Sequence, residues 1–392
     1  MKKALNATFR RMRNLYLFAL CASIVFFSAQ ACSEYFHNLN EQIEQRIKQL
    51  EYTDKTIQNF IRMVEGWKDK QGRCILVGWS EKLAEAKDNC EQNKISKKHL
   101  VGIEADVVAE LGQRIKKEIS FSENYFELDD VVKHRQTQCL GYTQLFYILG
   151  NSIGLEVKSV NIKRMRTGKL PVGSAHIAGI VTLSDGKIMI VDLVPNGFIS
   201  TPFILEEQFE KADTYLELKD KSNPLDLDRQ IQILGERELV AYIYNNRASI
   251  YIKQGQFEEA VSKLNKAIDY HPKYAEAYYN RGIALRHFGY LNGAAEDYTT
   301  AIELKPDFTE AYANRGIIYS KLGQFDKAIA DYNKAIEINS DFANLYYNRG
   351  IAYSKLGQMS KAIADYDRAI KLDGGLVAKT AIEQFKLDVN LN

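Results

Sequence analysis

Apolar residues in the first third of the chain recur at helical spacing. Between residues 38 and 64 they fall close to every 3.6 residues, and residues 101–115 follow the same pattern. No motif in this region carries chemistry, so residues 33–118 are predicted to be packing helices, with Trp67 and Trp79 in the core or at its edge. The apolar positions are Ile43, Ile47, Leu50, Ile57, Ile61 and Val64.

A different pattern begins in the middle third. Residues 139–153 are apolar on one helical face, and Gly154 follows as a stop signal. Two β-rich segments, 175–183 and 187–194, then flank a Ser-Asp-Gly turn. Residues 119–218 are therefore predicted to form an α+β core, in which a helix packs on an antiparallel sheet.

The last third of the chain repeats itself every 34 residues. The polar residues 219–234, which include Pro224, are predicted to be the linker that precedes it. Small residues keep the 34-residue step in several columns. These columns are Gly255, Gly289, Gly323 and Gly357; Ala260, Ala294, Ala328 and Ala362; and Ala267, Ala301, Ala335 and Ala369.

In its period, small residues and aromatics, the segment 241–374 resembles four copies of the tetratricopeptide repeat. The resemblance implies an all-α solenoid of antiparallel helix pairs with a groove that binds peptides or partner helices. Residues 376–391 are predicted to be a capping helix, with Ile382, Phe385 and Leu387 turned inward.

Two polar columns stand out on the first helix of each repeat. An asparagine column resembles the ladder of the O-linked N-acetylglucosamine transferases, which implies that its amides hold a peptide backbone; the alternative is that they bridge turns within the solenoid. An arginine column is expected to pair with neighbouring acidic residues. The columns are Asn246, Asn280, Asn314 and Asn348, and Arg247, Arg281, Arg315 and Arg349.

The N-terminus is typical of a secretory signal. Residues 1–13 are basic without an acidic residue, residues 14–31 are uncharged, and Ala29-Gln30-Ala31 fits a cleavage site. Cys32 follows, and the run resembles a bacterial lipoprotein box, which implies lipidation of Cys32. A cleaved signal peptide (1–31) without lipid and a retained anchor helix are the alternatives. The chain is therefore predicted to be exported, as a membrane-anchored lipoprotein or a periplasmic or extracellular bacterial protein.

Composition narrows the classes of function. Of the 392 residues, 46% are hydrophobic, which excludes a largely disordered chain, and the formal charge of +2 argues against a general nucleic-acid binder. The five cysteines lack metal-ligand spacing, so no structural zinc is predicted, and the thiol chemistry described below requires no metal or organic cofactor. Cys74 and Cys90 form either a disulfide in an oxidising compartment or two buried free thiols.

Cys139 is the candidate nucleophile because it opens a predicted helix. The positive end of a helix lowers the pKa of a thiol, and its free N–H groups can hold an oxyanion. His176 opens one predicted strand and Asp192 lies near the end of the next, which supplies a base and an anion to orient it. His134 is an alternative base. Each residue alone fits a structural role, so the hypothesis depends on their order and spacing.

With a cysteine at a helix start, then a histidine on one strand and an aspartate on the next, residues 125–200 resemble the core of bacterial transglutaminase-like proteins. The resemblance implies a papain-like fold with Cys139, His176 and Asp192 as a catalytic triad. It also implies the reaction: the thiolate attacks an amide carbonyl, ammonia or an amine leaves, and an amine or water resolves the thioester. The block 131–160 further resembles the subgroup that is often joined to tetratricopeptide repeats.

Hairpin geometry sets a condition for the triad. A two-residue loop would place His176 and Asp192 on opposite faces of the sheet. We therefore predict a three-residue loop, with Gly186 at positive φ and Leu183 opposite Lys187, or a bulge.

The predicted function is an exported transglutaminase-like cysteine enzyme whose repeats bind a protein substrate or scaffold. A thiol peptidase differs only in using water as the acceptor. A non-catalytic envelope adaptor is the third hypothesis, since Thr137 and Leu140 stand where the family usually has glycine and an aromatic residue. The predicted partners are a protein or peptide in the repeat groove and the membrane, through a lipid anchor or the N-terminal segment, but no nucleic acid.

Overall fold

The computed structural model describes residues 36–122, 125, 127–163, 175–194, 199–212, 215–219 and 230–373. The chain divides into two compact units, Met1–Glu236 and Arg237–Asn392. The predicted signal segment, Cys32 and the predicted capping helix lie outside the described residues. In the part of the chain that is described, no helix has the length and apolar character needed to cross a membrane.

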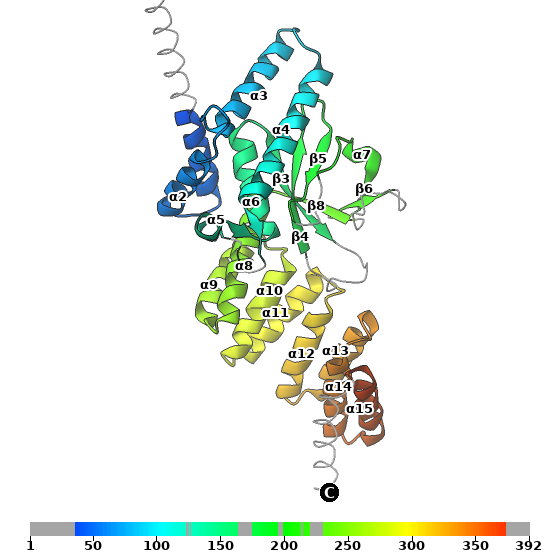
Figure 1. Cartoon of the computed structure of the whole chain (residues 1–392). Coiled ribbons are helices and arrows are strands. Elements are labelled where there is room, and N and C mark those ends of the chain that lie inside the picture. Colours follow the sequence, from blue (N-terminus) through cyan, green and yellow to red (C-terminus); the bar gives the residue numbers. More distant parts are fainter. Residues whose placement is uncertain are drawn as a thin grey trace, which may run out of the picture. The chain divides into compact units, whose positions relative to one another are not determined.

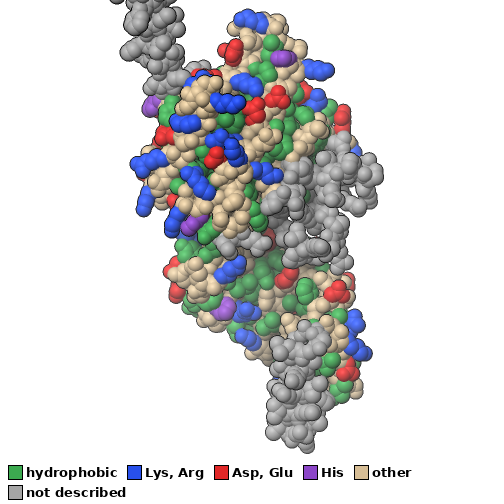
Figure 2. All heavy atoms as spheres, in the orientation of Figure 1, with side chains coloured by type: hydrophobic (Ala, Val, Ile, Leu, Met, Phe, Trp, Pro, Cys, Tyr) green, Lys and Arg blue, Asp and Glu red, His purple; other side chains and the backbone are tan. Residues whose placement is uncertain are grey.

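Helices form the first part of the N-terminal unit, as the apolar spacing predicts (Figure 1). Ile43 and Ile47 are fully buried, and so are the side chains of Trp67 and Trp79 apart from a few per cent. Lys and Arg side chains stand among acidic ones on the outer surface of these helices (Figure 2). The helices are residues 36–49, α2 (Asp54–Glu65), α3 (Ile75–Glu91), α4 (Lys97–Glu118) and α5 (Leu128–His134).

An antiparallel sheet of six strands, in the order β5-β4-β3-β8-β7-β6, forms the second part of this unit. A short parallel pair, β1 with β2, precedes it. The strands are β1 (Ser120–Phe121), β2 (Gln136–Thr137), β3 (Glu156–Lys163), β4 (Ala175–Thr182), β5 (Ile188–Val191), β6 (Phe209–Ala212), β7 (Tyr215–Leu218) and β8 (Gln230–Leu234), with the short helix α7 (Leu205–Gln208) before β6.

The helix α6 (Cys139–Ser152) packs over β3 and β4 on one face of this sheet (Figure 1). Gly179 makes the approach possible, because a Cβ there would lie 2.9 Å from Cδ1 of Phe146. The other face carries a second apolar cluster. Its fully or nearly fully buried members are Val160, Ile162, Ala178, Ile180, Ile188, Ile190, Phe209 and Ile231. The α+β arrangement predicted from the sequence is therefore confirmed, with a helix on an antiparallel sheet.

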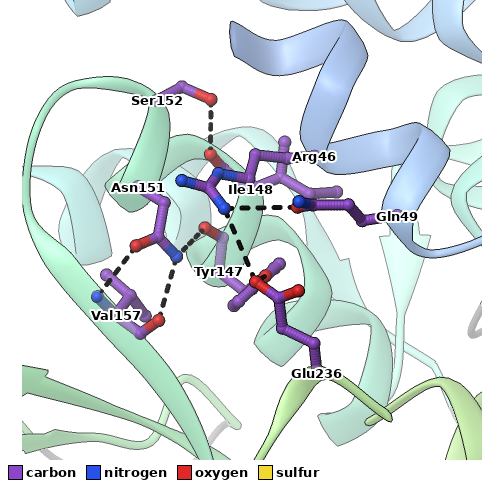
Figure 3. A network of polar contacts seen from close by, with 8 residues as sticks. All are labelled: Arg46, Gln49, Tyr147, Ile148, Asn151, Ser152, Val157 and Glu236. Atoms are coloured by element: carbon purple, nitrogen blue, oxygen red, sulfur yellow. Dashed lines mark hydrogen bonds and ion pairs between the residues drawn. The ribbon is translucent and has the colours of Figure 1, made fainter.

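Polar contacts connect the C-terminal half of α6 to neighbouring parts of the unit (Figure 3). The amide of Asn151 donates to the carbonyls of Tyr147 and Val157, and its oxygen accepts from the Val157 amide. The Tyr147 hydroxyl donates to Glu236 at 2.5 Å, and burial, with this hydrogen bond, raises the pKa of Tyr147. Arg46 reaches the same carboxylate at 3.5 Å. The helix is thus tied to β3 and to the last residue of its unit.

The predicted linker is wrong at its C-terminal end. Residues 230–234 form β8, which pairs with both β3 and β7 inside the sheet. Ile231 and Leu234 are each 1% exposed, so this segment belongs to the core of the unit. The strand is only five residues long and follows a polar run, so the sequence pattern does not reveal it.

The C-terminal unit consists of consecutive helix pairs, which confirms the predicted repeats. The first helices of the last three repeats each carry a glycine beneath a tyrosine of the second helix: at Gly316 a Cβ would lie 2.8 Å from Cε1 of Tyr332, whose side chain is buried. The helices are α8 (Glu236–Lys253), α9 (Phe257–Tyr270), α10 (Ala275–His287), α11 (Leu291–Leu304), α12 (Thr309–Lys321), α13 (Phe325–Ile338), α14 (Ala343–Lys355) and α15 (Met359–Asp373).

We predict that Gly316→Ala lowers the free energy of unfolding by about 1–3 kcal/mol, because the methyl group overpacks a tyrosine that has no room to move. Gly293→Ala is the control: its methyl would meet only Cδ1 of Leu285, at 3.5 Å, and alanine favours a helix. Urea denaturation followed by circular dichroism measures both. Equal effects of the two substitutions would contradict the packing argument.

Candidate functional site

An arginine–aspartate ladder runs through the repeats. In the third repeat, Nε and Nη2 of Arg315 donate to both carboxylate oxygens of Asp331 at 2.9 and 2.8 Å, while Nη1 donates to Thr299 of the preceding repeat at 2.9 Å. The same three bonds recur one repeat earlier and one later. Their residues are Arg281 with Asp297 and Asn265, and Arg349 with Asp365 and Asn333.

In each of these three arginine–aspartate pairs, which we call the rungs of the ladder, the aspartate is buried. The aspartates are only 5–6% exposed, and the hydrogen bonds that Arg281 and Arg349 donate to Asp297 and Asp365 hold the pKa of these arginines above the usual range. The expected pairing of the arginine column with acidic residues is confirmed for these three arginines. The guanidinium of Arg247 lies over the ring of the tyrosine three residues earlier at 5.3 Å, as those of the other three arginines do at 5.5–5.7 Å.

The asparagine column lies along the seam between successive first helices. The amide of Asn280 donates to the Asn245 oxygen at 2.8 Å, which links α10 to α8. Asn314 donates to the Tyr279 hydroxyl at 3.0 Å and accepts from Arg286 at 3.2 Å, which links α12 to α10. Two members of the column thus bridge helices within the solenoid, as the alternative interpretation expects.

Cys139 lies where the sequence predicts, at the first residue of α6, and its side chain is half-buried. The Thr143 hydroxyl lies 2.9 Å from the Cys139 carbonyl oxygen and 2.9 Å from the Ile177 carbonyl oxygen. One side chain therefore joins the start of the helix to the start of β4, at the residue that follows His176.

The hairpin has the predicted three-residue loop. The Leu183 amide donates to the Lys187 carbonyl at 2.8 Å, and Gly186 adopts φ of +86°. Val191 pairs with Gly179, so continuing the register by one residue sets Asp192 opposite the residue two positions after His176. The two residues hold register positions of the same parity, which is the condition set for the triad.

Asp192 is 2% exposed, and its carboxylate accepts a hydrogen bond from the Val194 amide at 3.3 Å. The body of α6 packs on the other parity of β4, at Gly179. The register positions of His176 and Asp192 therefore belong to the face of the hairpin opposite to the one that α6 covers.

His134, the alternative base, ends α5 and stacks on Tyr125, with 4.5 Å between ring centroids. The Tyr125 carbonyl in turn accepts from the Gln138 amide at 2.7 Å, one residue before the thiol. No pattern in the sequence indicates this contact, because it depends on the chain between the two rings folding back on itself.

The predicted disulfide between Cys74 and Cys90 is wrong. Cys74 caps the start of α3 and Cys90 lies near its end, so the two are about 24 Å apart along the helix at 1.5 Å per residue. A disulfide requires Cα atoms within about 7 Å. Both are free thiols, and burial raises the pKa of Cys74.

Comparisons with known proteins identify the repeats. A family model described as "TPR repeat" matches residues 248–286, 289–323 and 318–357, and one described as "Tetratricopeptide repeat" matches 343–375. The C-terminal region therefore carries tetratricopeptide repeats, a class of module that commonly binds protein partners. No curated protein matches the chain significantly.

Solved structures also resemble part of the chain. A crystal structure of MamA is 28% identical and covers 34% of this chain and 78% of its own, with a TM-score of 0.33. MamA from Desulfovibrio magneticus RS-1 is 24% identical and covers 40% and 96%, with a TM-score of 0.34. A thermophilic TPR protein of Thermus thermophilus is 21% identical and covers 38% and 82%, with a TM-score of 0.35. These scores add nothing to what the repeats establish.

We predict that Asp331→Ala lowers the free energy of unfolding by about 3 kcal/mol or more, because it leaves the half-buried Arg315 without its carboxylate. Glu337→Ala is the control: it removes an exposed partner of Lys334, and the expected loss is under about 1 kcal/mol. Urea denaturation measures both. A loss for Asp331→Ala as small as the control's would show that the ladder contributes little to stability.

Proposed function

We propose that this protein binds a partner protein or peptide through its tetratricopeptide repeats, and that the chain is exported, as the pattern of residues 1–31 indicates. The repeat array itself is the observation that carries the binding proposal. The first helices α8, α10 and α12 are joined by the half-exposed Asn280 and Asn314 of the asparagine column.

The first helices α10, α12 and α14 also carry half-exposed apolar and amide groups. Tyr279, Ile317 and Tyr347 lie against the cores of their repeats and keep part of their surface in solvent. Asn348 is also half-exposed and makes no side-chain hydrogen bond with any described residue. Apolar contact area with an adjacent amide is what an extended peptide needs from a binding surface.

The full chain should select peptides from a random dodecapeptide phage library, and Asn348→Trp should weaken the selected peptides at least tenfold because it fills the seam. Glu337→Trp, on the exposed side of α13, serves as the control and should change affinity less than twofold. Fluorescence anisotropy measures both. The proposal fails if nothing is enriched or if the two variants bind alike.

A second function is favoured by the start of α6. We propose that Cys139, His176 and Asp192 perform thiol acyl transfer or amide hydrolysis within a transglutaminase-like domain. The support is the half-buried thiol at a helix start and the Thr143 link to the residue after His176. His176 would take the thiol proton, and the helix N-terminus would stabilise the charge that develops on the carbonyl oxygen.

For this function, iodoacetamide should label Cys139 near neutral pH, and His176→Ala should slow that labelling at least tenfold because the base is gone. Cys90, a half-buried free thiol in the same chain, is the internal control and should keep its rate. Mass spectrometry then follows a glutamine peptide with a primary amine, where amine incorporation indicates a transglutaminase and water addition an amidase. Equal rates at both cysteines in both proteins would leave only the binding function.

A further inference from the structure

The connection between the first and second repeats contains a histidine. His271 caps the end of α9, and its main-chain carbonyl accepts a hydrogen bond at 3.0 Å from the amide of Tyr274, the residue before α10. The imidazole is half-buried and packs on the Tyr274 ring, with 5.8 Å between centroids. We call residues 271–274, with the ends of the two helices that they connect, the first joint. Because histidine changes its charge between about pH 5 and 8, the first joint contains a group that solvent pH can charge.

The equivalent joint of the next repeat carries a permanent cation. Lys305 lies 34 residues after His271, at the end of α11. Its ammonium lies 4.6 Å from the ring centroid of Phe308 and donates to the carboxylate of Glu276 at 3.0 Å. In the first repeat, the position equivalent to Glu276 is occupied by Tyr242. A positive charge on His271 therefore has a phenol at the position where the positive charge of Lys305 has a carboxylate.

Burial is the strongest influence on the imidazole of His271, and it lowers the pKa of this group. Two carboxylates oppose this effect, Glu238 on α8 and Glu276 on α10, but Glu276 is already paired with Lys305. The ammonium of Lys273, within the joint, lowers the pKa further. Protonation of the imidazole therefore destabilises the packed joint relative to an opened one, in which water surrounds the ring.

The ring against which His271 packs connects the joint to the asparagine column. Tyr274 is 6% exposed and stacks on Tyr242 of α8, with 4.4 Å between centroids. Its hydroxyl accepts from the Asn245 amide at 3.1 Å, and the Asn245 oxygen accepts from the Asn280 amide at 2.8 Å. A displacement of Tyr274 would thus disturb the contacts that hold α10 against α8, the first two helices of the proposed binding surface.

We propose that His271 makes the first joint a pH-dependent switch: protonation of the imidazole loosens the packing of α10 on α8 and thereby weakens the binding of a partner peptide. The effect on binding rests on the proposed binding function, whereas the loosening of the joint can be measured without a ligand. Loosening begins as the pH falls through about 6.5, the ordinary pKa of a histidine, because the opened joint takes up a proton before the packed one does. A partner bound at neutral pH is then released in acid.

Hydrogen–deuterium exchange of the full chain at about pH 7.5 and about pH 5 measures the loosening. Protection is the exchange rate of the unstructured chain divided by the observed rate at the same pH. Between the two pH values, protection of α8, α9 and α10 in wild type should fall at least about threefold more than that of α12, α13 and α14. His271→Asn should abolish this difference, and the fold should accept it because Asn339 holds the equivalent position two repeats later.

His287→Asn is the control, because this exposed histidine ends α10 on the side away from the first joint. It should leave the acid-dependent fall in protection in place. A fall that persists in His271→Asn, or one that is absent from wild type, overturns the inference.

Fluorescence anisotropy tests the effect on binding with peptides from the random library that contain no His, Asp or Glu. Wild type should bind them at least about threefold more weakly at pH 5 than at pH 7.5, and His271→Asn should change less than twofold. Equal affinities of wild type at the two pH values would overturn the switch while the proposed binding function stands. If the library yields no peptide, the binding function fails, and the exchange measurement still decides whether His271 controls the joint.

Discussion

The repeat array depends on buried aspartates that are neutralised by arginines. Asp297, Asp331 and Asp365 are each at most 6% exposed, and an unpaired carboxylate at such a depth destabilises the fold by several kcal/mol. Each is matched by a guanidinium in two-point contact, so the two helices of a repeat have one favourable register. Displacing either helix by one residue would separate the charges. The ion pair therefore specifies the register, while the packing of Tyr332 on Gly316 and its equivalents supplies the apolar contact.

The third hydrogen bond of each rung determines how repeats join. Nη1 of Arg281, Arg315 and Arg349 reaches back to the second helix of the preceding repeat, to an amide or hydroxyl oxygen. One side chain thus contacts three helices, and the neutralised charge lies at the boundary between repeats. In a solenoid, the free energy of unfolding is approximately the sum of the intrinsic stabilities of the repeats and the contributions of their nearest-neighbour interfaces. Each of these arginines contributes to both, because it bonds within its own repeat and to the preceding one.

The 34-residue period makes the repeats predictable from sequence, because the same contacts recur at fixed offsets and are visible as columns. The offset of sixteen residues that links Arg315 to Asp331 is visible too, but its bidentate geometry is not. The hairpin loop was predictable for a similar local reason, since the parity of two strands fixes the loop length. Strand β8 was missed because five residues next to a polar run carry too little signal, and its pairing with β3 joins segments far apart in the sequence.

Spacing in the sequence led to a wrong prediction where the structure between two residues determines the distance between them. The fifteen residues between Cys74 and Cys90 suggest a closed loop only if the chain turns back, and here they belong to the single helix α3. Near the candidate thiol, the structure shows a contact that spacing in the sequence does not indicate. Thr143 is nearly isosteric with valine in a largely apolar helix, yet its hydroxyl lies on the carbonyls of Cys139 and Ile177. Packing alone would be served by valine, so the hydroxyl has a use that packing does not provide: it holds the start of α6 against the start of β4.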